Sequence, residues 1–94
     1  MRFDGDTITI TNPGTRIQVL NTKEKVLTMT FHARLGNAGN VNAVTSSGDK
    51  DNGREIGPDG TVTFNFGGGS VRAESFYVDG TTAQDKIDWT AILN

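Results

Sequence analysis

Residues 27–35 decide the fold, because they read Leu-Thr-Met-Thr-Phe-His-Ala-Arg-Leu. Apolar side chains alternate here with polar ones at a period of two, and successive side chains of a β-strand point to opposite faces of the sheet. The pattern predicts a strand that is buried on one face and exposed on the other. The predicted buried face carries Leu27, Met29, Phe31, Ala33 and Leu35.

The same alternation recurs on both sides of this stretch. Residues 7–11 read Thr-Ile-Thr-Ile-Thr, residues 61–66 read Thr-Val-Thr-Phe-Asn-Phe, and residues 86–93 read Lys-Ile-Asp-Trp-Thr-Ala-Ile-Leu. Turn chemistry separates the segments at residues 12–14 (Asn-Pro-Gly) and 57–60 (Gly-Pro-Asp-Gly), since proline presets φ and glycine tolerates positive φ. We therefore predict an all-β fold, a single antiparallel β-sandwich or small barrel of about seven strands that spans residues 1–94.

Three further features of the connections follow from residue type. The alternation resumes at residues 41–45 after a Gly/Asn-rich stretch, which predicts a hairpin with residues 27–35. Residues 46–60 are polar and predict a surface connection. The apolar alternation changes phase near Glu74 and Ser75, which predicts a bulge or bend there.

Few residues are available for a core. Of the 94 residues, 34% are hydrophobic, 12 are glycine and none is cysteine. The lack of cysteine excludes a disulfide framework, a thiolate metal site and a cysteine nucleophile. Truncation of one core ring, Phe64→Ala, is expected to cost ~3–5 kcal/mol of unfolding free energy. The predicted core consists of Leu27, Met29, Phe31, Val62, Phe64, Phe66, Ile87 and Trp89.

Charge and hydropathy argue against two classes of partner. The net charge is −2 and no Lys/Arg cluster occurs, so we expect no binding to nucleic acid. No apolar run approaches the ~18 residues of a membrane span, so we expect no membrane partner. Residues 1–6 also lack the apolar region of a secretory signal.

No group of residues has the spacing of a catalytic or metal site. His32 is the single histidine and lies on the polar face of its strand, and neither Ser70 nor Ser75 lies in a Gly-x-Ser-x-Gly turn. Residues 49–55 superficially resemble a calcium loop, but the glycine is fifth rather than sixth, and Gly60 stands where the bidentate glutamate is required. We expect no enzyme activity, no metal and no cofactor.

Aromatic residues leave open a role in binding sugars. Trp89 shares its face with three apolar residues, which favours a core position, whereas the phase change leaves the direction of Tyr77 open. The carboxylates are interpreted as residues of solvated turns and faces: Asp4, Asp6, Glu74, Asp79, Asp85 and Asp88.

The order of turns and strands in the second half has a recognisable form. Residues 39–41 (Gly-Asn-Val) close the predicted hairpin. Residues 52–66 follow and read Asn-Gly-Arg-Glu-Ile-Gly-Pro-Asp-Gly and then Thr-Val-Thr-Phe-Asn-Phe. Residues 76–80 (Phe-Tyr-Val-Asp-Gly) and 86–89 (Lys-Ile-Asp-Trp) follow. Over residues 27–93 this order resembles the small β-sandwich capsid decoration (cement) proteins of tailed bacteriophages.

The resemblance implies a virion structural protein rather than an enzyme. Such a protein binds the outside of an icosahedral phage head, commonly as a homotrimer, and clamps neighbouring subunits of the major capsid protein. It would be located on the capsid exterior after synthesis in the host cytoplasm. The alternative is a small carbohydrate- or ligand-binding β-sandwich module.

The beginning of the chain is the candidate contact segment. Residues 1–6 combine both charges with one aromatic ring and precede the first alternating segment, so they are predicted either to form an N-terminal arm or to fray. In the first case the arm adds main-chain hydrogen bonds at a sheet edge and inserts Phe3 into a pocket on a partner. The candidate interface residues are Arg2, Phe3, Ile8 and Ile10.

Overall fold

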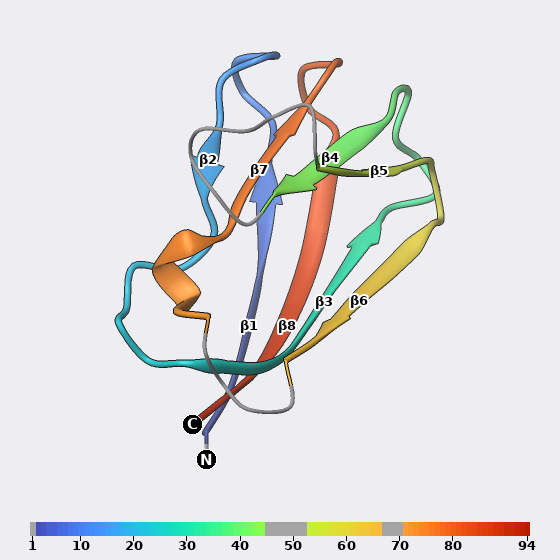
Figure 1. The fold of residues 1–94 in the computed structure, drawn as a ribbon. Coiled ribbons are helices and arrows are strands. Elements are labelled where there is room, and N and C mark those ends of the chain that lie inside the picture. The colour runs from blue at the N-terminus through green and yellow to red at the C-terminus, as the bar shows by residue number, and fades with distance from the viewer. Residues whose placement is uncertain (1, 45–52, 67–70) are drawn as a thin grey trace.

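The computed structural model describes residues 2–44, 53–66 and 71–94, which form two four-stranded antiparallel sheets packed face to face (Figure 1). The prediction of an antiparallel β-sandwich is confirmed, and the described residues contain eight strands where about seven were predicted. The first sheet has the order β1-β8-β3-β6, from β1 (Arg2–Thr9), β8 (Lys86–Leu93), β3 (Val26–Ala33) and β6 (Thr61–Asn65). The second has the order β2-β7-β4-β5, from β2 (Ile17–Gln18), β7 (Tyr77–Gly80), β4 (Val41–Val44) and β5 (Arg54–Ile56).

Strand β8 is the centre of the first sheet. It pairs with β3 on one side and with β1 on the other, where the register runs from Arg2 opposite Leu93 to Thr9 opposite Lys86. The two ends of the described chain therefore lie side by side (Figure 1). The described residues contain no helix with the length and apolar character that spanning a bilayer requires.

The core between the sheets is built around four phenylalanine rings. Phe31 and Phe76 are completely buried, and their ring centroids lie 6.1 Å apart. Phe64 meets Phe31 edge to face at 6.0 Å, while Phe66 meets Phe76 at 5.7 Å. These are favourable aromatic geometries, so the cluster links β6 and β3 of the first sheet to the segment before β7 of the second.

The predicted core is confirmed in its centre and corrected at its margins. The rings of Phe64 and Phe66, with Val62, are only partly buried, because β6 is the outer strand of its sheet and one flank of each side chain lacks a neighbouring strand. Leu27 does not belong to the buried cluster. The predicted residues that are buried are Met29, Phe31, Ile87 and Trp89.

A change of register explains the position of Leu27. The pairing of β3 with β8 shifts between Val26 and Thr28, so Val26, which is completely buried, takes the inward direction. An irregularity of this kind breaks the period of two. Leu35, at the other end of the predicted face, lies beyond β3 and is 73% exposed.

The predicted hairpin between residues 27–35 and 41–45 is wrong. β3 pairs with β6 and β8, whereas β4 pairs with β5 and β7, so the connection between β3 and β4 crosses from one sheet to the other.

The predicted surface connection, residues 46–60, contains β5, and its residues 46–52 lie outside the described residues. At the predicted bulge, a short 3₁₀ turn, η2 (Ala73–Ser75), changes the phase instead.

The two turns predicted from proline and glycine are confirmed. Gly14 has a φ of 85°, and the Thr15 N–H donates to the Asn12 carbonyl at 3.0 Å, as a type II turn requires. In the second turn Asp59 has a φ of 65°, and the Gly60 N–H donates to the Gly57 carbonyl at 2.8 Å.

The predicted N-terminal arm is part of the sheet. Residues 2–6 belong to β1 and pair with β8 along their whole length, while Met1 lies outside the described residues. This pairing bonds the main-chain groups of Asp4 and Asp6 to β8, so the polar segment is held in the sheet.

Candidate functional site

The outer face of the first sheet is the candidate functional surface. We use this name for the side chains of β1, β8, β3 and β6 that point away from the core. Most of them are threonine or another polar residue, and most are half-buried or exposed. The outer face consists of Phe3, Gly5, Thr7 and Thr9 from β1, Lys86, Asp88, Thr90 and Ile92 from β8, Thr28, Thr30 and His32 from β3, and Thr61, Thr63 and Asn65 from β6.

Cross-strand polar pairs organise the β3 and β6 half of the outer face. The hydroxyls of Thr30 and Thr63 lie 3.1 Å apart, and the Thr28 hydroxyl donates to Asn65 Oδ1 at 3.2 Å. Both β3 hydroxyls are thus directed towards β6. Towards β8 and β1, these two threonines therefore expose mainly carbon atoms.

A groove of about 640 Å³ lies on the outer face beside these threonines. Its floor is low because Gly5 has no side chain, and a Cβ there would lie 2.9 Å from the Trp89 carbonyl oxygen. The Thr90 methyl is close to the same point, and the Phe3 ring, 72% exposed, stands at the margin. The groove therefore suits an apolar group, and its lining is Phe3, Asp4, Gly5, Thr28, Thr30, Thr90, Ala91 and Ile92.

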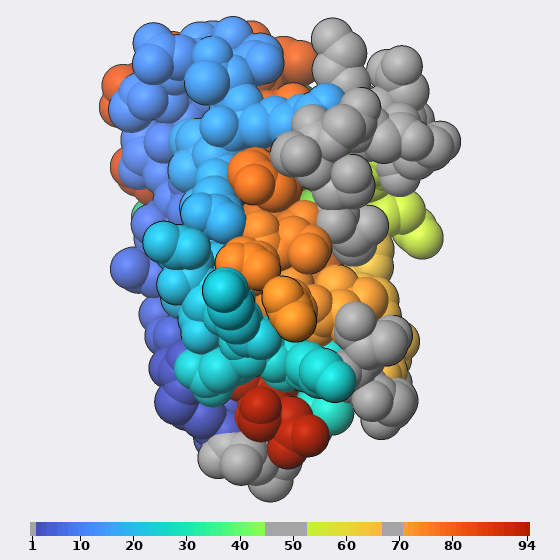
Figure 2. Space-filling view, turned by 60° about the vertical axis from the view of Figure 1, so that its left-hand side comes forward, coloured from blue at the N-terminus to red at the C-terminus, as the bar shows by residue number. Residues whose placement is uncertain are grey.

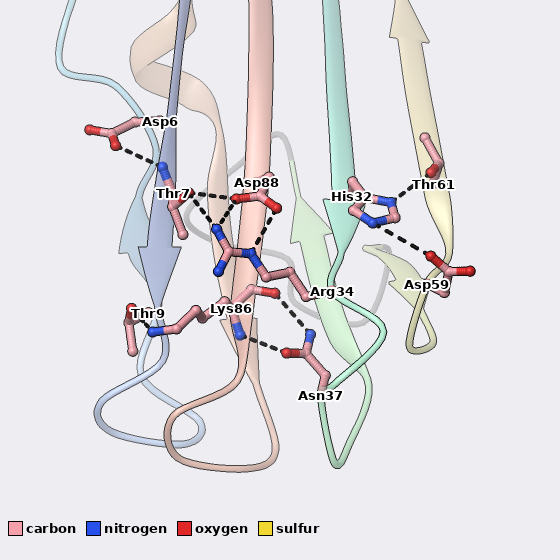
Figure 3. Close-up of polar contacts among 10 residues, drawn as sticks. All are labelled: Asp6, Thr7, Thr9, His32, Arg34, Asn37, Asp59, Thr61, Lys86 and Asp88. Atoms are coloured by element: carbon pink, nitrogen blue, oxygen red, sulfur yellow. Dashed lines mark hydrogen bonds and ion pairs between the residues drawn. The ribbon is translucent and has the colours of Figure 1, made fainter.

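A paired charge cluster occupies the opposite end of the outer face (Figure 3). Arg34 donates from Nε and Nη2 to the two carboxylate oxygens of Asp88, at 2.9 and 3.0 Å. The Thr7 hydroxyl donates to the same carboxylate and accepts from Arg34 Nη2 at 3.3 Å. These hydrogen bonds, those from Arg34 first and that from Thr7 second, hold the pKa of the Asp88 carboxyl below its ordinary value.

We expect this arrangement to be visible in an acid titration. A lowered folded-state pKa means that the Asp88 pair contributes stability above the unfolded-state pKa, and that this contribution is lost as the pH falls through the folded-state pKa. The Arg34→Ala substitution should raise the midpoint of Asp88 towards its ordinary value, measured on its side-chain carboxyl by NMR. Arg54→Ala, in the second sheet, is the control. An unchanged midpoint in Arg34→Ala would show that the pair does not form in solution.

His32 is confirmed as half-exposed and serves as a link between strands. Its Nδ1 lies 3.0 Å from the Thr61 hydroxyl, and its Nε2 lies 3.7 Å from Asp59 Oδ1 (Figure 3). Within residues 2–44, 53–66 and 71–94, no group of three or more histidine, cysteine or acidic side chains could hold a metal ion. The calcium-like segment at residues 49–55 lies mostly outside the described residues.

The structure separates the four predicted interface residues. Phe3 is exposed and lines the groove, and Arg2 is exposed but bound to Glu24 by two hydrogen bonds. Ile8 is partly buried against the core. Ile10 is completely buried and bonded through its main chain to the β7–β8 connection, so it has no surface to offer a partner and belongs to the core.

Two features were not predicted from residue type. The groove requires Gly5 and Thr90 to be neighbours, which only the pairing of β1 with β8 achieves. Asp85 was predicted to be an ordinary turn residue but is 4% exposed, and its carboxylate accepts the N–H groups of Ala38 and Gly39 at 2.8 and 2.9 Å. The one signal for its burial is the loop around Ala38 and Gly39, whose main-chain N–H groups need an acceptor.

The aromatic candidates for sugar binding are both built into the sheets. Trp89 is 4% exposed on the inner side of β8, as its position in the alternation predicted. Tyr77 is half-buried in β7, opposite Gln18 and Val44 in the pairing of the second sheet. Phe3 is therefore the exposed aromatic ring beside the groove.

Comparison with known proteins gives no assignment. No family model matches the chain, and no match was found among curated proteins or solved structures.

Proposed function

We propose that this protein is a virion structural protein, a capsid decoration (cement) protein that binds the outside of an icosahedral phage head. It stabilises the head by clamping neighbouring subunits of the major capsid protein. The observation that carries the proposal is the groove beside the exposed Phe3 on the outer face of the sandwich. The order of turns and strands that resembles decoration proteins supports the same function.

The chemistry of the groove fits protein docking. Its lining is largely carbon, and Phe3 is one of two large hydrophobic side chains that are exposed among the described residues. Aromatic anchors that enter a desolvated contact account for much of the free energy of typical protein interfaces. With a net charge of −2, long-range steering is weak, so binding to the capsid should weaken only modestly with salt.

We expect Phe3→Ala to lower the affinity for undecorated particles by about tenfold or more, since removal of an anchor ring typically costs about 2 kcal/mol or more of binding free energy. Co-sedimentation with particles measures the affinity. Leu35→Ala is the matched control, because Leu35 is 73% exposed and does not line the groove. Equal binding of the wild type and Phe3→Ala would refute docking through this groove.

The second candidate, a carbohydrate- or ligand-binding module, rests on the same groove. Phe3 could stack on a sugar ring, with Thr28, Thr30 and Thr90 beside it in the lining of the groove. The two functions are distinguished by the ligand. Chemical-shift changes at these threonines on addition of neutral oligosaccharides, without binding to particles, would favour the sugar-binding module.

A further inference from the structure

The free edge of β1 is a surface at which another strand could pair. β1 is the outer strand of the first sheet, and Figure 2 shows the blue N-terminal segment at the molecular surface along one side. Main-chain groups of an outer strand alternate between its partner and the open side. The Ile10 N–H bonds to the Asp85 carbonyl just before β8, so even-numbered residues face β8. Phe3, Gly5, Thr7 and Thr9 therefore direct their main-chain groups outwards.

Two carboxylates already occupy main-chain donors on this open side. The Gly5 N–H donates to Asp4 Oδ1 at 2.8 Å, and the Thr7 N–H donates to Asp6 Oδ1 at 2.8 Å. Figure 3 shows the second of these bonds. An incoming strand would have to displace both carboxylates before it could form a ladder with β1.

Neighbouring groups hold the first carboxylate in place. Asp4 Oδ2 forms an ion pair with Arg2 Nη1 at 3.1 Å, and Arg2 binds Glu24 with its other nitrogens. Asp4 therefore contacts a side chain with one oxygen and the main chain with the other. Displacing it would break an ion pair as well as the hydrogen bond to Gly5.

The same residues oppose pairing between two copies of this strand. An antiparallel pair centred on Gly5 would place Asp4 of each copy opposite Asp6 of the other. A pair centred on Asp6 would place the two Asp6 side chains opposite each other. Like charges directly opposite each other destabilise a sheet, so both central registers are disfavoured.

We propose that the β1 edge is a latent pairing surface for a second copy of this chain, kept closed by the hydrogen bonds that Asp4 and Asp6 accept from Gly5 and Thr7. Unprotected edges of this type promote association, and inward-pointing charges are a known means of preventing it. The inference does not rest on the proposed capsid function, because it concerns the main-chain hydrogen bonds at the edge of β1, although Asp4 and Gly5 also line the groove.

The test compares two double variants with the wild type. Asp4→Ala/Asp6→Ala removes both the acceptors and the charges, whereas Asp4→Asn/Asp6→Asn keeps an acceptor oxygen at each position. Sedimentation velocity gives the association state, and amide hydrogen exchange of Gly5 and Thr7 reports whether the edge is paired. Far-ultraviolet circular dichroism confirms folding, and the single variant Asp6→Ala, at an exposed position, replaces the double variant if folding fails.

We expect the alanine variant to associate at concentrations at least about tenfold lower than the wild type, with slower exchange at Gly5 and Thr7 as the ladder forms. The asparagine variant, which keeps the acceptor oxygens but lacks the charges that disfavour the central registers, should associate less than the alanine variant. The proposal is overturned if the alanine variant behaves as the wild type, or if it associates without protection of these two amides. Association of the asparagine variant as strong as that of the alanine variant would also overturn it, since charge alone would then close the edge.

Discussion

The Phe31→Ala variant is expected to lose ~3–5 kcal/mol of unfolding free energy, because the substitution removes a ring from the centre of the core. Phe31 is completely buried and contacts the rings of both Phe64 and Phe76. Its removal would leave a cavity between the two sheets that rigid strands cannot close. A domain of this length has a total stability of ~5–14 kcal/mol, so the variant should be close to unfolding at moderate temperature.

Urea denaturation followed by Trp89 fluorescence measures this loss. Phe64→Ala is the matched control, because its ring lies in the same cluster but on the outer strand β6 and is only partly buried. It should cost less than Phe31→Ala, which corrects the expectation from alternation alone. If the two variants lose the same free energy, the core is not centred on Phe31.

The second large effect is expected for Asp85→Ala, at about 2–6 kcal/mol of unfolding free energy. This carboxylate is nearly inaccessible and accepts two main-chain N–H groups, from Ala38 and Gly39. Without it both donors lose their partner in a part-buried place, and each such loss costs ~1–3 kcal/mol. The loop cannot easily shift, since a Cβ at Gly39 would overlap the hydroxyls of Thr81 and Thr82.

The Asp85→Asn variant keeps the shape of the side chain and changes its hydrogen bonding, so it measures the contribution of the hydrogen bonds. It retains one acceptor oxygen and should therefore lose about half as much free energy as Asp85→Ala. Hydrogen exchange at Ala38 and Gly39 should accelerate in the alanine variant. A stability within about 0.5 kcal/mol of the wild type in Asp85→Ala would show that water replaces the carboxylate at little cost.

Local patterns predicted which residues form strands better than they predicted which strands meet. The alternation in residues 86–93 correctly placed Ile87 and Trp89 inside, because the strand is regular throughout. The same rule failed at Leu27, since the register shift beside it arises from pairing with β8, far along the chain. The wrong hairpin has a similar cause, because proximity in sequence does not specify which sheet a strand joins.

The candidate site was predictable only in part. An aromatic ring at Phe3 with few local reasons for burial indicated a contact residue, and the structure leaves it exposed. The groove beside it depends on Gly5, Thr90 and Thr30, which three strands bring together. No local pattern connects these positions. Ile10 was predicted to be an interface residue but is buried. Its burial depends on elements that follow it in the chain, which its local sequence does not reveal.

The central place of β8 in the first sheet has a consequence for synthesis. β1 and β3 leave the ribosome long before β8. They do not pair with each other, because β8 lies between them in the sheet. On a nascent chain β1 and the edge of β3 that faces β8 remain unpaired until β8 is available, whereas the other edge of β3 can already pair with β6. Sheets assembled from such distant contacts form slowly. Translation arrest before residue 86 should therefore leave a chain that depends on chaperones, and release of β8 should trigger folding of the whole sandwich.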